Sequence, residues 1–111
     1  MQNHDSNLFD GQWELGSLNL TTGEKANSGN DIRSKNFVKV KPGSRVGFTR
    51  TDTTSLYMLT VAYKQDKSFS RYMGAKSSMP AYYIMNADEY YIMFYLYNRI
   101  TPLENLKIEL T

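Results

Sequence analysis

Basic side chains alternate with one aromatic ring along residues 32–41. If this segment is extended, one of its faces presents Phe37 with four basic residues, namely Arg33, Lys35, Lys39 and Lys41, because side chains alternate across a strand. Ammonium and guanidinium groups bind phosphate oxygens and donate hydrogen bonds to hydroxyl groups. The pattern predicts either a surface that binds an anionic or highly hydroxylated polymer, or a solvated outer face with a partly shielded phenylalanine.

Tyrosines are concentrated late in the chain, where six of the nine lie between residues 82 and 97. In an extended segment 90–97, one face suits a core and the other carries a tyrosine-rich ladder of Tyr91, Met93, Tyr95 and Tyr97. A tyrosine ring packs flat against the C–H groups of a sugar, and its hydroxyl bonds to sugar hydroxyls. The ladder either contacts a glycan or is covered by a loop, a neighbouring domain or another subunit.

Trp13 is the only tryptophan. A lone tryptophan in a domain of this size belongs either to the edge of the core or to an exposed binding surface. In the second case the neighbouring Gln12 and Glu14 would supply hydrogen bonds to a ligand.

Residues that could support catalysis are few. The chain has no cysteine and one histidine, His4, and it contains none of the common nucleophile, phosphate-binding or zinc-protease motifs. Asp88 and Glu89 are adjacent, so they point to opposite faces of a strand or are solvated in a loop. Asp31 or Asp52 could contribute to a calcium site, but the spacing of a calcium loop is absent. We therefore predict no enzyme, no catalytic residue, no metal and no cofactor.

The elements that must position these residues are short strands. The chain has 111 residues and a net charge of +2, which suits one domain and does not predict nucleic-acid binding. No apolar run is long enough for membrane insertion. We expect residues 1–6 to be a disordered N-terminal segment and residues 7–111 to form a single domain. Strand patterns occur at 13–19, 32–41, 45–51, 56–64, 69–73, 82–85, 90–97 and 105–110, and 21–30 is the most loop-like segment.

About seven or eight short strands separated by turn signals predict an all-β fold. We expect an antiparallel β-sandwich of the jelly-roll type, with a closed barrel as the alternative. The last segment, 105–110, places Leu106, Ile108 and Leu110 on the inner face.

Several short motifs, in order, resemble a known domain family. They are Trp13-Glu14-Leu15-Gly16, Thr22-Gly23, the run Ile32 to Gly43, the hairpin Val61 to Phe69, and the strands Asn86 to Phe94 and Asn105 to Leu110. Together they are similar to carbohydrate-binding-module-like β-sandwich domains in tail, baseplate and host-recognition proteins of phages that infect Gram-positive bacteria. Asp31 and Met93 stand where relatives often have arginine. The resemblance implies a jelly-roll-like sandwich, a non-catalytic binding role, and a location in a virion or on an extracellular surface.

These observations lead to a hypothesis of function. The domain is expected to bind host cell-wall polysaccharide through aromatic stacking and polar contacts, in several copies per particle. The predicted ligand-binding residues are Trp13, Arg33, Lys35, Tyr91, Tyr95 and Tyr97. The alternative is an assembly domain that contacts other tail proteins or a second copy of itself through the tyrosine ladder. A third alternative is an accessory domain of a glycan-active enzyme.

Overall fold

A computed structural model describes residues 7–111, so the expected N-terminal segment 1–6, with His4, lies outside the described residues. The strands of the described part are β1 (Trp13–Leu15), β2 (Ser17–Leu18), β3 (Lys25–Ala26), β4 (Ile32–Ser34), β5 (Val38–Lys39), β6 (Arg45–Thr49), β7 (Met58–Lys64), β8 (Phe69–Lys76), β9 (Ala81–Ile84), β10 (Glu89–Leu96) and β11 (Lys107–Leu110). These residues form no helix, and so contain none that could cross a membrane. The predicted all-β class is confirmed.

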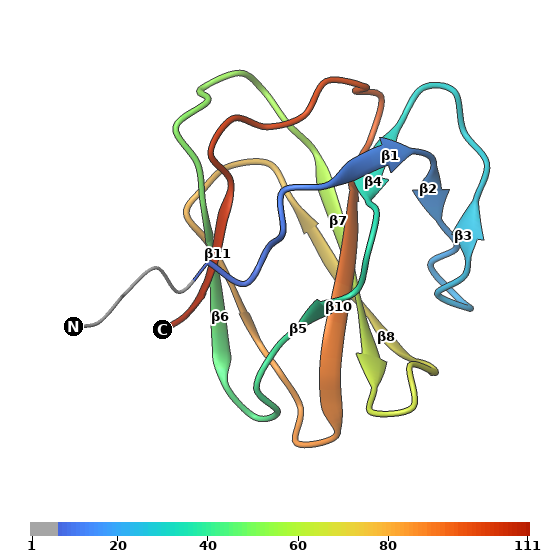
Figure 1. Cartoon of the computed structure of the whole chain (residues 1–111), viewed down its shortest axis with the longest axis vertical. Coiled ribbons are helices and arrows are strands. Elements are labelled where there is room, and N and C mark those ends of the chain that lie inside the picture. The colour runs from blue at the N-terminus through green and yellow to red at the C-terminus, as the bar shows by residue number, and fades with distance from the viewer. Residues whose placement is uncertain (1–6) are drawn as a thin grey trace.

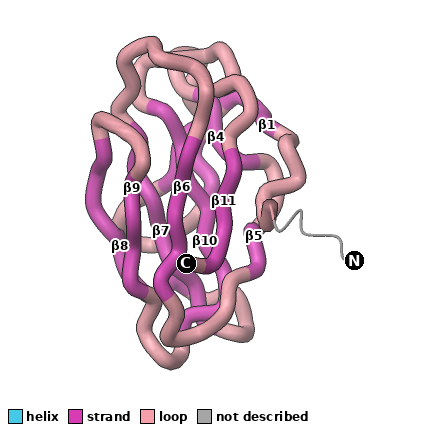
Figure 2. The backbone as a smooth tube through the Cα atoms, turned by 90° about the vertical axis from the view of Figure 1, so that its left-hand side faces the viewer, coloured by secondary structure: helices cyan, strands magenta, loops and turns pink. Residues whose placement is uncertain are grey.

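The strands form two facing sheets and one small hairpin. The larger sheet has the order β1-β4-β10-β7-β8, with β5 also paired to β10, and the smaller has the order β11-β6-β9. Figure 2 shows the smaller sheet in front of β7 and β10, and Figure 1 shows the β2–β3 hairpin to one side of the larger sheet. Because the two sheets are separate and each has free edges, the fold is a β-sandwich and the barrel alternative is wrong.

The strand pairs are nested in the way that a jelly roll requires. β7 pairs with β8, β6 with β9, and β4 with β10, all antiparallel. Each pair encloses the previous one along the chain, as if one long hairpin had been folded over itself. This arrangement brings β4 and β10, which carry most of the predicted site residues, side by side in the larger sheet.

The core lies between the two sheets. Val46, Phe48, Met58, Phe94 and Ile108 have no exposed surface, and a buried side chain of this size contributes about 1.5–3 kcal/mol. They come from β6, β7, β10 and β11, where apolar residues alternate with outward-facing ones. The alternation predicted for segments 90–97 and 105–110 therefore directs their inner faces to the core between the sheets.

The predicted strands 13–19 and 32–41 are each interrupted. Gly16 has a φ of +136° and separates β1 from β2, a conformation that side chains other than glycine rarely adopt. Residues 35–37 separate β4 from β5, and the segment predicted as a loop contains β3. The β2–β3 hairpin turns back over the larger sheet as a result of these breaks.

Candidate functional site

Arg33 is buried, and its guanidinium holds the β2–β3 hairpin. Its Nη1 atom donates to the carbonyl oxygens of Ser17 (3.0 Å) and Ala26 (2.9 Å), one from each hairpin strand, and its Nε atom donates to Glu14 (2.7 Å). Both predicted alternatives, a solvated face and an anion-binding surface, placed this side chain at an exposed position, but only 9% of the residue is exposed. The expected exposure of Arg33 is wrong because the carbonyls that satisfy the guanidinium come from a hairpin that the sequence pattern does not reveal.

Gly16 leaves the space that the Arg33 guanidinium occupies. A Cβ atom at this position would lie 2.1 Å from Nη1 of Arg33. Glu14 binds Arg33 and also Lys25, whose Nζ atom lies 2.7 Å from the same carboxylate oxygen. The hydrogen bond from Lys25, followed by that from Arg33, lowers the pKa of Glu14 against the opposing effect of its burial.

The middle of the tyrosine ladder is covered by this hairpin. Tyr95 is 8% exposed and Met93 1%, and both pack with Leu18 of β2 in a second apolar cluster outside the main core. The hydroxyl of Tyr63 donates to the carbonyl of Gly23 (2.7 Å) in the hairpin turn, and burial raises the pKa of Tyr63 to about 12. Among the alternatives for the ladder, cover by a segment of the same chain applies to Met93 and Tyr95. The expected exposure of Tyr95 on the outer face is therefore wrong.

Below the hairpin, the same face opens into a groove of about 410 Å³, which we call the lysine groove. It is lined by Thr22, Gly23, Glu24, Lys25, Phe37, Tyr63, Lys67 and Met93. The Nζ atom of Lys67 lies 5.3 Å from the ring centre of Phe37 and 5.2 Å from that of Tyr91, within the range of cation–π attraction. Lys39 is the register partner of Tyr91, so the two side chains share this face.

Above the hairpin, two exposed tyrosines lie on the same face. Tyr57 is 49% exposed and Tyr97 is 60% exposed, and their rings meet edge to face with centres 6.2 Å apart. The amide of Tyr97 donates to the carbonyl of Tyr57 (2.8 Å). A pocket of about 300 Å³ adjoins them and is lined by Ser55, Leu56, Tyr57, Tyr97, Asn98 and Arg99.

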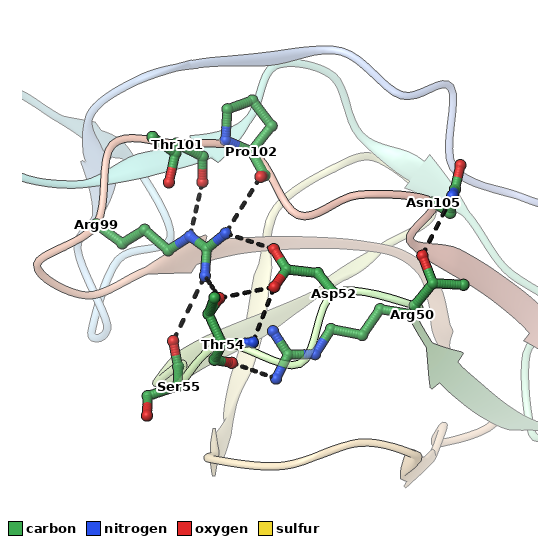
Figure 3. A network of polar contacts seen from close by, with 9 residues as sticks. Arg50, Asp52, Thr54, Ser55, Arg99, Thr101, Pro102 and Asn105 are labelled. Atoms are coloured by element: carbon green, nitrogen blue, oxygen red, sulfur yellow. Dashed lines mark hydrogen bonds and ion pairs between the residues drawn. The ribbon is translucent and has the colours of Figure 1, made fainter.

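The loops that carry this tyrosine pair are braced by Arg99 (Figure 3). Its guanidinium donates to the Asp52 carboxylate (2.7 Å), to the Thr54 hydroxyl, and to the carbonyls of Thr101 (2.8 Å) and Pro102 (3.3 Å). These bonds join the β6–β7 loop to the β10–β11 loop. The hydrogen bonds from Thr54, with that from Arg99, hold the pKa of Asp52 well below its usual range. Tyr57 and Tyr97 therefore lie on a connected polar scaffold.

The two aspartates considered for calcium are used within the chain. Asp31 accepts hydrogen bonds from the Asn98 amide (2.6 Å) and the Ser28 hydroxyl (2.8 Å), while Asp52 binds Arg99 and Thr54. Within residues 7–111, no group of three histidine, aspartate or glutamate side chains lies close enough to hold a metal ion.

Trp13 and Lys35 do not join the tyrosines. Trp13 is half-buried and packs on the main core, with its ring centre 5.3 Å from Phe9 and 5.5 Å from Phe94. This is the core-edge placement, on the inner side of the larger sheet. Lys35 is exposed at the break between β4 and β5, and its carbonyl accepts a bond from Lys25 (2.9 Å).

Glu89 was expected to point away from Asp88 or to be solvated, and it has no exposed surface. It accepts hydrogen bonds from Ser70 (2.7 Å), from Nε and Nη2 of Arg71 (2.8 and 3.0 Å) and from the amide of Asn86 (2.6 Å). Burial raises the pKa of Glu89, but Arg71 and the other donors outweigh it, so the net shift is downward. Of the two alternatives, solvation in a loop is wrong for Glu89, because Ser70 and Arg71 of β8 and the amide of Asn86 surround its carboxylate.

Sequence reasoning missed three exposed members of this face, Tyr57, Lys67 and Tyr72, the last of which is 37% exposed on β8 as the register partner of Val61. Counting back by two from Leu59 places Tyr57 on the outer face of β7, so the alternation could have identified it. Lys67 lies in the β7–β8 turn with a φ of +68°, and no periodicity indicates where its side chain points. No family model matches the chain, and no curated protein or solved structure is significantly similar to it.

Proposed function

We propose that this domain is a non-catalytic carbohydrate-binding module of a phage tail or surface adhesion protein, and that it recognises host cell-wall polysaccharide. The observation that carries the proposal is the exposed pair Tyr57 and Tyr97 on loops braced by Arg99. Half-exposed aromatic rings held in place offer a sugar ring apolar contact without a large loss of side-chain entropy. Polar groups of Asn98 and Ser55 in the adjoining pocket can bond to its hydroxyls.

The outer face is long enough to contact more than one sugar. Tyr91 lies in β10 and Tyr97 directly follows this strand, six residues later, which corresponds to about 20 Å at the usual rise of a strand. The lysine groove and the tyrosine pair thus lie at the two ends of one face. A polymer lying along β10 would contact both, and several copies of the domain would strengthen its attachment by raising the effective concentration.

The experiment is a titration with purified wall polysaccharide, monitored by NMR and repeated with the domain displayed in several copies. We expect Tyr97→Ala and Tyr57→Ala each to weaken binding about two- to twelvefold, the equivalent of about 0.5–1.5 kcal/mol per aromatic contact. Tyr82→Ala is the matched control, because Tyr82 is 44% exposed and belongs to the other sheet. Absence of binding in the multi-copy form, or an equal loss in the control, would contradict the proposal.

The assembly alternative is supported by Ile100, which is 54% exposed in the loop that follows Tyr97. Together with the tyrosine pair it could form an apolar contact with another tail protein or a second copy. Light scattering after size exclusion distinguishes the two functions. A stable oligomer that dissociates on Tyr97→Ala favours assembly, whereas a monomer that binds polysaccharide favours the proposed module.

A further inference from the structure

We infer that the lysine groove binds anionic oxygens, so that the ligand is an anionic wall polysaccharide rather than a neutral one. This inference rests on the proposed function and names the class of its substrate. It starts from Lys67, whose ammonium lies against the rings of both Phe37 and Tyr91. Because those rings already restrain its flexible stem, less side-chain entropy is lost when the ammonium binds an anion.

Two lysines beside the groove, Lys67 and Lys39, lack internal counter-ions. Within the part of the chain that the structure describes, no carboxylate forms an ion pair with either of them, and both are exposed. Lys25 differs, because Glu14 neutralises it at 2.7 Å. Two ammonium groups next to one groove therefore remain available to an external anion.

The charged groups at this groove are predominantly basic. Lys25, Lys67 and Glu24 line it, Lys39 shares its face through the register with Tyr91, and Glu14 and Arg33 form an ion-pair cluster with Lys25. These four basic and two acidic side chains give a net charge of +2, which complements an anion at this end of the face.

The geometry favours a charged polysaccharide over a nucleic acid. Single-stranded nucleic acids bind where bases stack on free aromatic faces along a basic channel. Here Lys67 lies over the rings of Phe37 and Tyr91, and Phe37 also meets Tyr63 edge to face at 4.8 Å. The groove thus offers ammonium donors rather than a stacking platform, and the exposed tyrosines lie about 20 Å away along β10.

The test compares three samples of one wall polysaccharide: intact, stripped of phosphodiesters with hydrofluoric acid, and amidated at its carboxylates. We expect one of the two treatments to weaken binding strongly, which also identifies the anionic group. Lys67→Gln and Lys39→Gln should each weaken binding of the intact polymer about two- to fivefold, and 1 M salt should abolish the difference between these variants and the wild type. Lys107→Gln is the matched control, since this exposed lysine lies on β11 of the other sheet and should leave binding unchanged.

Each other outcome overturns the inference in a distinguishable way. Equal binding of all three samples, with no effect of the lysine variants, would show that the ligand is neutral, and the proposed function would stand. Absence of binding to every sample in the multi-copy form would remove both the proposed function and the inference. A thymidine oligonucleotide that displaces the intact polysaccharide at lower concentration would replace the inference with nucleic-acid binding.

Discussion

Replacing Glu89 with glutamine removes a buried charge while keeping the size of the side chain. The carboxylate accepts four hydrogen bonds of 3.0 Å or less, from Ser70, Arg71 and the amide of Asn86. These residues join β8 to the β9–β10 turn. The carboxylate therefore closes the end of the sandwich opposite the tyrosine pair, and its removal should lower the stability of the whole domain.

The expected loss follows from which donors an amide can still satisfy. A glutamine at this position keeps one acceptor oxygen, and its NH₂ group must face donors on the other side. The least unfavourable orientation points NH₂ toward Ser70, whose hydroxyl can turn to accept, and leaves Nε of Arg71 without an acceptor. Removing one partner of a fully buried ion pair costs about 3–5 kcal/mol. The Arg71 side chain is 38% exposed, so water replaces part of the lost interaction, and we expect a smaller loss of about 2–3 kcal/mol.

The measurement is urea and thermal unfolding followed by circular dichroism. For a domain of this size the expected loss corresponds to a decrease in Tm of about 8–12 °C. Asp88→Asn is the matched control, since it makes the same chemical change at the exposed neighbouring carboxylate and should stay within about 0.5 kcal/mol of the wild type. A Glu89→Gln domain as stable as the Asp88→Asn control would refute the assignment of Glu89 as a structural ion-pair centre.

Three further predictions concern stability. Gly16→Ala should destabilise the domain by about 2–4 kcal/mol, because it adds a clash with Arg33 to the strain of a positive φ. Gly43→Ala is the control with strain alone, since a Cβ atom there meets nothing within 4 Å, and equal losses of the two variants in urea unfolding would disprove the clash. Folding lowers the pKa of Glu89, so the contribution of this carboxylate to stability is complete above the unfolded pKa of about 4.3 and is lost as pH falls through the lower folded pKa. Below about pH 4.5, Tm should therefore decrease more steeply in the wild type than in Glu89→Gln. Parallel curves of Tm against pH would contradict this. Trp13→Ala should lower the free energy of unfolding by about 2–4 kcal/mol through lost core contacts. At temperatures where the variant is folded, its affinity for the polysaccharide should be unchanged. A selective loss of affinity would show that Trp13 belongs to the binding site.

The main sandwich could be predicted because its signals are local. Alternation along residues 90–97 places Tyr90, Ile92, Phe94 and Leu96 inward; the last three are buried and Tyr90 is half-buried. Ile108 is likewise buried in the closing strand, although Leu110 at its end is 45% exposed. A side-chain period of two is fixed by the backbone of each strand, so it can be recognised without knowing the partner strand.

The β2–β3 hairpin could not be predicted in this way. Each of its strands has two residues, too few to show a period, and its position depends on long-range bonds to Arg33. Glu89 was misjudged for the same reason, because its main partner, Arg71, lies on β8, a strand that is not paired with β10. Alternation indicates which face a side chain lies on, but burial depends on what the rest of the chain places over that face.

Arg33 and Lys67 show how geometry separates two cations that look equivalent in the sequence. The planar guanidinium of Arg33 has several fixed donors, and two backbone carbonyls and one carboxylate use them within the protein. The compact ammonium of Lys67 has no carboxylate within ion-pair distance among residues 7–111. It lies over the rings of Phe37 and Tyr91, which attract a cation without accepting all of its hydrogen bonds. By holding the hairpin over Met93 and Tyr95, Arg33 separates the tyrosine pair from the lysine groove on the outer face. A ligand that contacts both sites would therefore have to be extended, with a part that contacts tyrosine at one end and a part that attracts lysine at the other.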